Sequence, residues 1–235
     1  MLILFDIDLT LISTFGSGMH ALEQAGKDLF GASFTIKGVE FAGRLDPLII
    51  DDLLRLNGRA VSAEHREAMR RGYATHLGPR LVQPGVSRPL PGVMALLDRV
   101  RARRDVEIGV LTGNFPETGG MKLRACGIDP GWFNVNAWGD ESPHDPPDRE
   151  HLPPVAMARY RERHGRAIEA SRVVVIGDTP HDARCALVNG CRALGVATGL
   201  SSIGALRSSG FHRVVENLSE TDDIEAWLLD GKMAR

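Results

Sequence analysis

The first ten residues, MLILFDIDLT (residues 1–10), hold an apolar run that is followed at once by two acids. Leu2–Phe5 is apolar throughout, which is typical of a strand buried on both faces of a sheet. Asp6 and Asp8 follow it, and ligands of open α/β sheets bind at the carboxyl ends of strands. Two interpretations stay open here: a polar turn that ends the strand, or two acids that share a cation.

Length and composition place the chain among ordinary globular proteins. Its 235 residues suffice for one large domain or for a core domain with a smaller companion. The formal net charge of -2, from 28 basic and 30 acidic residues, gives no reason to expect a nucleic acid or an anionic membrane as partner. The three cysteines, Cys126, Cys185 and Cys191, form no C-x-x-C pair, so free thiols are expected rather than disulfides or a zinc site.

The sequence predicts no membrane segment and no signal peptide. No apolar run approaches the roughly 18 residues that span a bilayer. The beginning of the chain lacks a basic region and carries an acid at position six. We therefore expect a cytoplasmic protein.

Residues 15–84 are predicted to be all-helical. After a connector that contains Gly16 and Gly18, apolar side chains recur at helical spacing and no strand-like run occurs. The expected helices span residues 19–30, 48–56 and 62–77. This change of character marks an inserted helical domain, with the connector as its hinge.

The rest of the chain alternates between helices and strands. Further strands are predicted over residues 106–111, 135–138, 172–176, 194–197 and 214–215. Helices are predicted over residues 93–103, 118–126, 154–164, 203–208 and 222–229. This alternation predicts an α/β fold, a doubly wound parallel sheet with helices on both faces. Residues 1–14 plus 85–235 would form this core, and residues 15–84 the inserted helical domain.

Polar residues follow three of the predicted strands. Thr112, Gly113 and Asn114 end the strand at 106–111, and Asp178 and Asp182 follow the strand at 172–176. The carboxyl ends of parallel strands share one edge, so these residues and the two N-terminal acids are expected to converge. Clustered carboxylates repel one another without a cation, and oxygen ligands with few histidines suit Mg²⁺. The hydroxyl and the backbone amides at the 112–114 turn suit an anion, so together the set indicates phosphoryl transfer.

Taken together, the spaced motifs resemble the haloacid dehalogenase-like (HAD) hydrolase superfamily. The resemblance rests on D-x-D-x-T after the first strand, on the Thr-Gly-Asn turn, and on the late G-D-x-x-x-D. The inserted helices resemble the C1-type cap of that family, and the likeness covers essentially the whole chain. It implies a HAD-like Rossmannoid core domain with an inserted helical cap domain.

The resemblance also implies roles for the acids. Asp6 would be the nucleophile that forms an aspartyl-phosphate, and Asp8 the general acid and base. Asp6, the backbone carbonyl of Asp8, and Asp178 would hold Mg²⁺ as cofactor. Asp182 would either support the water shell of the metal or orient the metal site without binding the ion itself.

Further residues would bind the substrate. The resemblance implies that Thr112 and the amides of Gly113 and Asn114 bind the phosphoryl oxygens. Arg44, in the loop Gly43-Arg44-Leu45-Asp46, resembles a substrate-facing residue of the cap, although an exposed loop arginine is the alternative.

The acid at position 8 favours a phosphatase over a dehalogenase, because a halide leaving group needs no proton. The expected substrate is a small phosphorylated metabolite, with phosphoglycolate-like compounds as the nearest guess. A phosphomutase of the β-phosphoglucomutase type and an inactive HAD-fold binding module remain alternatives. Whether the protein is a monomer or a homodimer stays open.

The chain departs from the family pattern at the position of one active-site cation. A Lys-Pro pair often precedes the last acidic motif, but here the corresponding stretch contains Arg149 and no lysine. Lys122, eight residues after Asn114, resembles an alternative placement of that lysine. We therefore expect Lys122 to neutralise charge between nucleophile and phosphate, with Arg149 as the rival.

Overall fold

The apolar run Leu2–Phe5 (β1) is an inner strand of a five-stranded parallel sheet in the computed structural model, which describes residues 1–230. The strand order is β4-β1-β5-β6-β7. The other four strands are β4 (Glu107–Val110), β5 (Val173–Gly177), β6 (Arg192–Val196) and β7 (Arg213–Val215). Because β1 has a neighbour on each side and helices on both faces, its four apolar side chains are completely buried.

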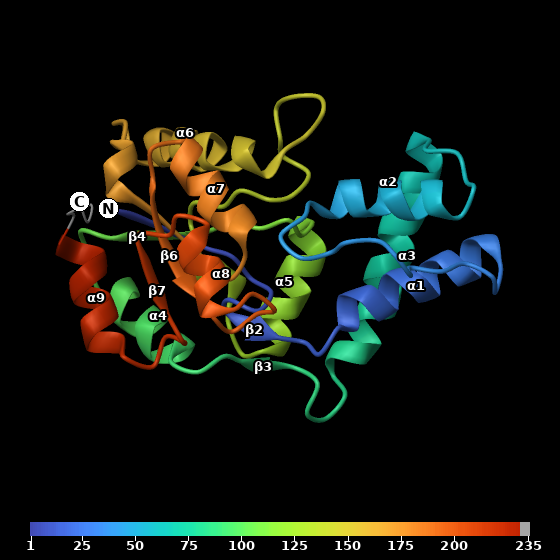
Figure 1. Ribbon diagram of the computed structural model, residues 1–235, viewed down its shortest axis with the longest axis horizontal. Helices are drawn as coiled ribbons and strands as arrows, with labels where there is room; N and C mark the ends of the chain where they lie inside the picture. Colours follow the sequence, from blue (N-terminus) through green and yellow to red (C-terminus); the bar gives the residue numbers. More distant parts are fainter. Residues whose placement is uncertain (231–235) are drawn as a thin grey trace.

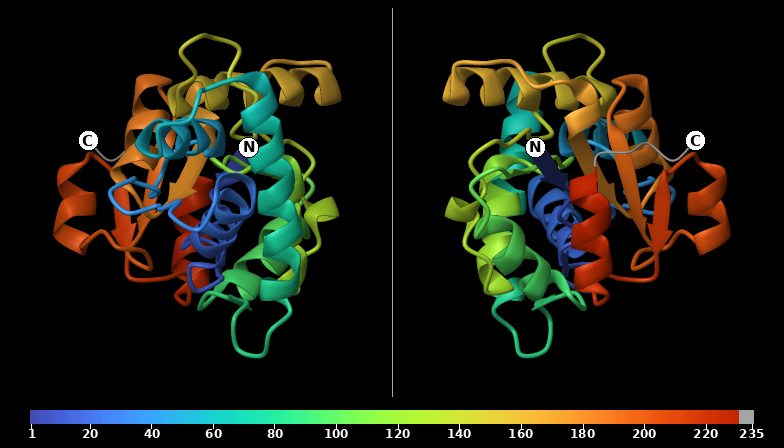
Figure 2. Two further views of the ribbon diagram at one scale, coloured as in Figure 1. Left: turned by 90° about the vertical axis from the view of Figure 1, so that its right-hand side faces the viewer. Right: turned by 90° about the vertical axis from the view of Figure 1, so that its left-hand side faces the viewer.

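Helices cover both faces of this sheet, as the doubly wound prediction requires (Figures 1 and 2). One face packs against α4 (Val93–Arg101), α5 (Pro116–Ala125) and α9 (Thr221–Asp230). The other face packs against α6 (Leu152–His164), α7 (Pro180–Val188) and α8 (Ile203–Ser208). Alternation along β1 sends Ile3 and Phe5 to the first face and Leu2 and Leu4 to the second, so β1 contributes to both hydrophobic cores.

Three helices inserted between β1 and β4 form a separate layer at one end of the molecule (Figure 1). They are α1 (Ser17–Phe30), α2 (Asp46–Leu56) and α3 (Ala63–Leu81), and they share a hydrophobic core of their own. We call this layer the cap. The helical insertion is thus confirmed, whereas the domain boundaries at 14/15 and 84/85 stay predictions. Residues 231–235 of the predicted core lie outside the described residues.

Two short strands that the sequence did not predict join the crossings between core and cap. β2 (Ile12–Ser13) pairs antiparallel with β3 (Arg88–Pro89), and the amide of Leu90 donates to the carbonyl of Leu11 at 2.9 Å. Phe15 and Gly16 then turn the chain into α1 with φ of 46° and 73°. The outgoing and returning segments are therefore bound to each other at the predicted hinge.

The strand predicted at residues 135–138 is wrong as a regular strand. This segment runs beside β4, and the amide of Ala137 donates to the carbonyl of Val110 at 2.8 Å. The amide of Val110, however, donates to the side chain of Asn136 at 3.0 Å rather than to a backbone carbonyl. A side-chain acceptor thus replaces a backbone acceptor, and only an isolated bridge between Leu111 and Ala137 remains.

Two expectations from composition can be compared with the described residues. Cys126, Cys185 and Cys191 are buried free thiols, as expected. Within residues 1–230, no helix combines the length and the apolar character needed to cross a membrane.

Three short 3-10 turns complete the described part of the chain: η1 (Pro130–Trp132), η2 (Arg149–His151) and η3 (Ala170–Arg172). The second of them directly precedes α6 and lies against α7. It thereby brings the 139–149 loop back to the carboxyl ends of the strands.

Candidate active site

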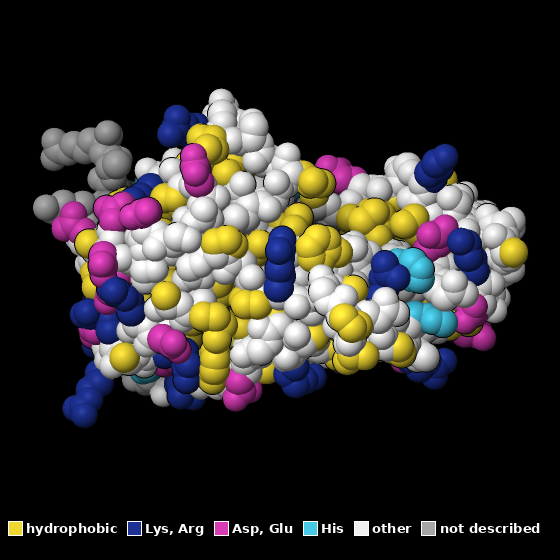
Figure 3. Space-filling view, turned by 90° about the horizontal axis from the view of Figure 1, so that it is seen from below, with side chains coloured by type: hydrophobic (Ala, Val, Ile, Leu, Met, Phe, Trp, Pro, Cys, Tyr) yellow, Lys and Arg dark blue, Asp and Glu magenta, His cyan; other side chains and the backbone are white. Residues whose placement is uncertain are grey.

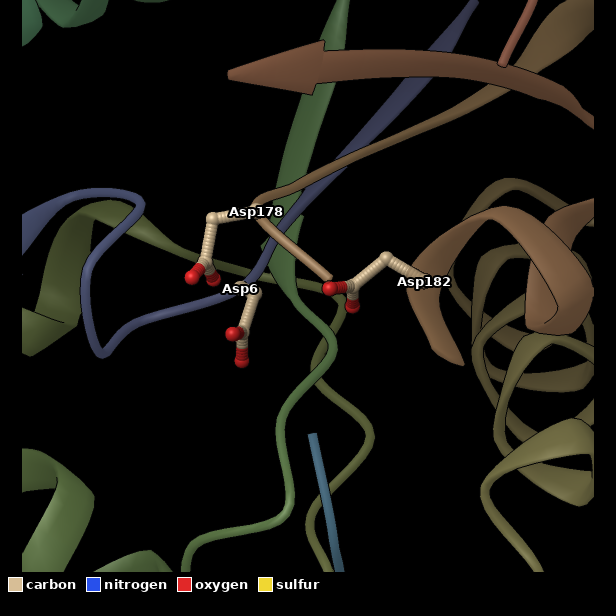
Figure 4. A group of neighbouring side chains, drawn as sticks. All are labelled: Asp6, Asp178 and Asp182. Atoms are coloured by element: carbon tan, nitrogen blue, oxygen red, sulfur yellow. The ribbon is translucent and has the colours of Figure 1, made fainter. Parts of the chain in front are cut away.

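Three buried acids meet at the carboxyl ends of β1 and β5 (Figure 4). Asp6 follows β1, Asp178 follows β5, and Asp182 lies in the first turn of α7. One oxygen from each carboxyl group lies within 4.8 Å of the others. The two strands are parallel neighbours with Phe5 opposite Ile176, so the sheet register brings Asp6 to the level of Gly177, the residue before Asp178.

The turn before α7 fixes the position of Asp182. Thr179 caps this helix, and its amide and hydroxyl both donate to Asp182 Oδ2, at 3.1 and 2.7 Å. Gly177 leaves room for this carboxyl group, because a Cβ at that position would lie 2.1 Å from Asp182 Cγ. The sequence G-D-T-P-H-D (residues 177–182) therefore directs the carboxyl group of Asp182 back towards the sheet through local contacts.

Burial and mutual repulsion raise the pKa values of these acids. Burial is the largest cause of the raised pKa of Asp178, about 8, and of Asp6, about 6. Asp182 adds repulsion to both, while the hydroxyl of Thr10 donates to Asp178 at 3.2 Å and favours its charged form. Thr10 belongs to the D-x-D-x-T motif but had no predicted role of its own. A cluster of this kind is stabilised by a bound cation.

Arg149 is the cation that faces Asp6. Its Nη2 lies 3.0 Å from Asp6 Oδ1 and donates to Asp182 Oδ1 at 2.6 Å. The side chain is buried, and its position is set by η2, which Asp148 caps at its first turn. Arg149, the predicted rival, thus lies beside Asp6 where Lys122 was expected, because the 3-10 turn brings it there; the role of Lys122 in turnover stays a prediction.

Lys122 lies in the same site but binds the other acid of the motif. It is buried on α5, and its Nζ donates to Asp8 Oδ2 and to Asn114 Oδ1, both at 2.6 Å. The amide group of Asn114 donates to the same oxygen of Asp8 at 2.9 Å. Lys122 and Asn114 therefore orient the half-buried carboxyl group of Asp8.

The turn at residues 112–114 lies beneath the cap. Thr112 Oγ1 accepts a hydrogen bond from the side chain of Asn114 at 2.8 Å, which leaves the hydroxyl proton free to donate elsewhere. Gly113 is in close contact with the cap loop, since a Cβ there would lie 1.9 Å from the carbonyl oxygen of Arg44. The carbonyl of Gly113 also accepts from the amide of Asp46 at 2.7 Å. A side chain at position 113 would therefore push the cap away.

Arg44 reaches the same cavity as the catalytic candidates, as expected of a substrate-facing residue. Its guanidinium, however, is already paired, with Nη1 2.7 Å from Asp52 Oδ2. The carbonyl of neighbouring Gly43 accepts from Arg149 Nη1 at 3.3 Å. The loop that contains Gly43 and Arg44 thus contacts the core through its backbone, whereas the Arg44 side chain binds α2.

Two cap residues belong to the site although the sequence gave them no predicted role. Asp46, the first residue of α2, is buried and accepts from the amide of Phe115 at 3.2 Å. Burial raises the pKa of Asp46 to about 7, although Lys122 lowers it. Tyr73 is buried on α3, where the nearby Lys122 partly offsets the rise in its pKa that burial causes. Asp46 stands beside Arg44 in the loop that the sequence singled out, whereas nothing in the surrounding sequence distinguishes Tyr73.

The raised pKa of Asp46 predicts a pH-dependent effect of Asp46→Asn on stability. An acid whose pKa rises from 3.8 to about 7 on folding destabilises the native state increasingly between these two pH values. Asn carries no charge and retains an acceptor for the amide of Phe115. We expect similar unfolding temperatures for variant and wild type at pH 4, and a variant several degrees more stable at pH 8.

Thermal unfolding at both pH values measures this difference, and Glu40→Gln, an exposed acid of the same cap, is the control. The full penalty is on the order of 2–4 kcal/mol for a fully buried carboxylate whose pKa rises by this much. Equal stability differences at pH 4 and pH 8 would contradict the assignment.

The convergent residues surround one cavity of about 220 Å³ between the core and the cap. Eight of the nine predicted site residues line it: Asp6, Asp8, Arg44, Thr112, Gly113, Asn114, Lys122 and Asp178. Asp182 contacts Arg149 and Thr179 from outside this lining. The structure thus brings these predicted residues together and shows how they pair, while their roles stay predictions.

Comparison with known proteins gives one family match. Residues 3–187 match the family model described as haloacid dehalogenase-like hydrolase. The matched region begins in β1 and ends within α7, so it includes the cap and all the acids described above. No protein among the curated sequences matches.

Solved structures share the fold over nearly the whole chain. A hydrolase from Pseudomonas syringae is 22% identical, with a TM-score of 0.70, covering 96% of this chain and 97% of its own. CbbY from Rhodobacter sphaeroides in complex with phosphate is 20% identical, with a TM-score of 0.73 and coverage of 93% and 95%. A predicted phosphoglycolate phosphatase from Haemophilus somnus 129PT is 19% identical, with a TM-score of 0.70 and coverage of 95% and 97%.

Proposed function

The chain belongs to the haloacid dehalogenase-like hydrolases, and from this premise we propose that it is a Mg²⁺-dependent phosphatase of small phosphate monoesters. The observation that carries the proposal is the pairing of two acids with two cations in one cavity. Asp6 contacts Arg149, and Asp8 contacts Lys122. This pairing supports nucleophilic attack by Asp6 and proton transfer by Asp8.

Asp6 is the proposed nucleophile. Its carboxylate would attack phosphorus and displace the alcohol, which leaves the phosphoryl group on Asp6 as an acyl phosphate. Arg149 holds one oxygen of this carboxylate at 3.0 Å and so fixes its orientation. The Nε atom of Arg149 is buried and has no hydrogen-bond partner among the described residues. The guanidinium lines the cavity, where its positive charge suits an anionic substrate.

Asp8 is the proposed carrier of the proton. It would protonate the leaving oxygen in the first step and accept a proton from the attacking water in the second, so that the enzyme is regenerated. The ammonium of Lys122 and the amide of Asn114 hold the same oxygen of Asp8. The other oxygen of the carboxyl group is free for this task, since no hydrogen bond to it occurs within residues 1–230.

The turn at residues 112–114 is the proposed phosphoryl-binding element. The hydroxyl of Thr112 already accepts from Asn114, so its proton can be donated to a phosphoryl oxygen. The amides that precede α5 add donors at a helix N-terminus. Because the cap loop contacts Gly113, binding at this turn takes place beneath the cap.

The acid cluster fits Mg²⁺ by its ligand chemistry. Asp6, Asp178 and the backbone carbonyl of Asp8 would hold the ion, which when bound would neutralise the acids and the phosphate charge. Asp182 suits an orienting role, because Thr179 and Arg149 already occupy its oxygens. Burial, followed by repulsion from Asp182 and Asp6, raises the pKa of Asp178 to about 8, and a bound cation would relieve that repulsion.

Hydrolysis of p-nitrophenyl phosphate before and after metal removal tests the proposal. We expect chelation to lower turnover at least ~100-fold and added Mg²⁺ to restore it, because a metal ion contributes several kcal/mol of charge stabilisation. Excess Mg²⁺ should also raise the unfolding temperature of the wild type by about 5–10 °C at a hundredfold excess over its dissociation constant. Asp178→Asn should lose most of this rise.

Turnover that is unaffected by chelation, together with an unfolding temperature that Mg²⁺ does not change, would contradict the metal assignment. Absence of phosphate release at any Mg²⁺ concentration would contradict the phosphatase. Isomerisation of β-glucose 1-phosphate without phosphate release would instead indicate a phosphomutase.

A further inference from the structure

The cavity above the acids has two chemically different parts. Its floor, at the strand ends, is formed by the acids, by Arg149 and by the turn at residues 112–114. Large apolar side chains form much of the rest: Leu9, Phe15, Met19, Leu22, Phe41 and Ile49. Since the phosphoryl group would occupy the floor, the leaving group of the substrate would face these apolar walls.

Exposed hydrophobic side chains gather at the mouth of the same cavity. Phe15 is 57% exposed, Met19 43% and Leu200 89%, and all three line it. They are three of the eight large hydrophobic residues that are exposed within residues 1–230. Seen from below, hydrophobic side chains lie over the middle of the molecule, interspersed with polar and charged ones (Figure 3). Apolar surface that gathers around a cavity marks a binding site, whereas single exposed residues do not.

The polar side chains of the cap that reach the cavity are few, and each of them has a partner within the protein. Arg44 pairs with Asp52 at 2.7 Å, and Asp46 accepts from the amide of Phe115 at 3.2 Å. The hydroxyl of Tyr73 interacts with the ammonium of Lys122. A polyhydroxylated leaving group would give up its hydrogen bonds to water and find few replacements on this side. Each unmet hydrogen bond weakens binding.

Two further polar side chains of the cavity come from the segment that leads into α1. Ser13 and Thr14 line the cavity and are nearly buried. They offer two hydroxyl groups, which is enough to contact one polar atom but not a sugar with several hydroxyls.

From this arrangement, which rests on the proposed phosphatase activity, we propose that the preferred substrate is a phosphate monoester of an apolar alcohol, with an alkyl or aromatic leaving group. The P–O bond to that alcohol breaks as Asp6 bonds to phosphorus, and the alcohol leaves with the proton of Asp8. Water then releases inorganic phosphate and returns a proton to Asp8.

Matched pairs of primary phosphate esters test this specificity. The pairs are propyl phosphate against glycerol 1-phosphate, and benzyl phosphate against glucose 6-phosphate, with 2-phosphoglycolate as an acidic comparison. We expect kcat/KM to be at least tenfold higher for the apolar member of each pair. From ethyl to butyl phosphate it should rise about fourfold per CH₂, the value expected for a buried methylene.

Met19→Gln tests the cavity wall directly. Both side chains are unbranched and suit a helix, so the change replaces an apolar wall by a polar one. We expect the ratio of kcat/KM for benzyl phosphate to kcat/KM for glycerol 1-phosphate to fall five- to tenfold. Leu29→Gln is the matched control, because Leu29 lies on the same helix with 44% exposure and does not line the cavity.

The outcomes separate the two proposals. Faster hydrolysis of glycerol 1-phosphate, glucose 6-phosphate or 2-phosphoglycolate would overturn the apolar specificity and leave the phosphatase intact. Equal effects of Met19→Gln and Leu29→Gln would also overturn it. No phosphate release from any of these esters or from p-nitrophenyl phosphate would overturn both.

Discussion

Replacing Asp6 by Asn is expected to lower phosphate release on the order of 10⁴-fold or more, as removal of a catalytic nucleophile does in other enzymes. The amide has nearly the shape of the carboxylate and can still accept a hydrogen bond from Arg149, but it cannot form the acyl phosphate. Initial rates of p-nitrophenyl phosphate hydrolysis measure the loss. Mass spectrometry of acid-quenched wild type should show a phosphoryl adduct on the peptide that contains Asp6.

Asp98→Asn is the control for this experiment, because Asp98 is an exposed acid on α4. Thermal unfolding shows whether either variant has lost its fold. A folded Asp6→Asn protein that retains turnover within tenfold of the wild type would exclude Asp6 as the nucleophile.

Replacing Arg149 by Met is expected to impair both catalysis and folding. Its guanidinium is the buried cation between Asp6 and Asp182, so its loss leaves uncompensated carboxylates in the interior. Removing one partner of a buried ion pair costs about 3–5 kcal/mol. We expect turnover to fall about 10³-fold, and Arg149→Lys to recover part of it, since lysine keeps the charge but not the two-acid geometry. Chemical denaturation and initial rates measure the two effects.

Lys122→Met separates the roles of the two cations. Lys122 orients Asp8, and protonation by Asp8 is needed for a poor leaving group such as an alkoxide but hardly for p-nitrophenolate. We expect Lys122→Met to slow the hydrolysis of alkyl phosphates much more than that of p-nitrophenyl phosphate. Arg149→Met should slow both alike. The reverse pattern would return Lys122 to the role beside Asp6 that the sequence predicts.

Most of the fold follows from local sequence patterns. Helical spacing of apolar side chains in α1 and α2, and the apolar runs of β1 and β5, are short-range signals, so these elements lie within a few residues of their predicted bounds. Residues 135–138 show where such signals fail. They are apolar enough for a strand, but Asn136 provides a side-chain acceptor to β4 at a place where a regular strand would provide a backbone carbonyl.

Membership of the site was equally readable from sequence, because acids and small polar residues after buried strands share the edge of a parallel sheet. Asp6, Asp178 and Thr112 were found in this way. Asp46 and Tyr73 were not, since a helical insertion has no comparable rule for which side chains it turns towards the core. Their positions depend on how α2 and α3 pack against the strand ends.

The sequence by itself determined the parallel α/β core, the helical insertion, and the acids and polar turn at the strand ends. Only the tertiary structure decided that Arg149 faces Asp6 while Lys122 contacts Asp8. It also decided that the guanidinium of Arg44 forms an ion pair with Asp52. Arg149 and Asp6 are far apart in the chain, and their contact depends on η2 lying against α7. Pairings of this kind arise from packing between distant elements, whereas residue types and spacings reveal only which groups are available to pair.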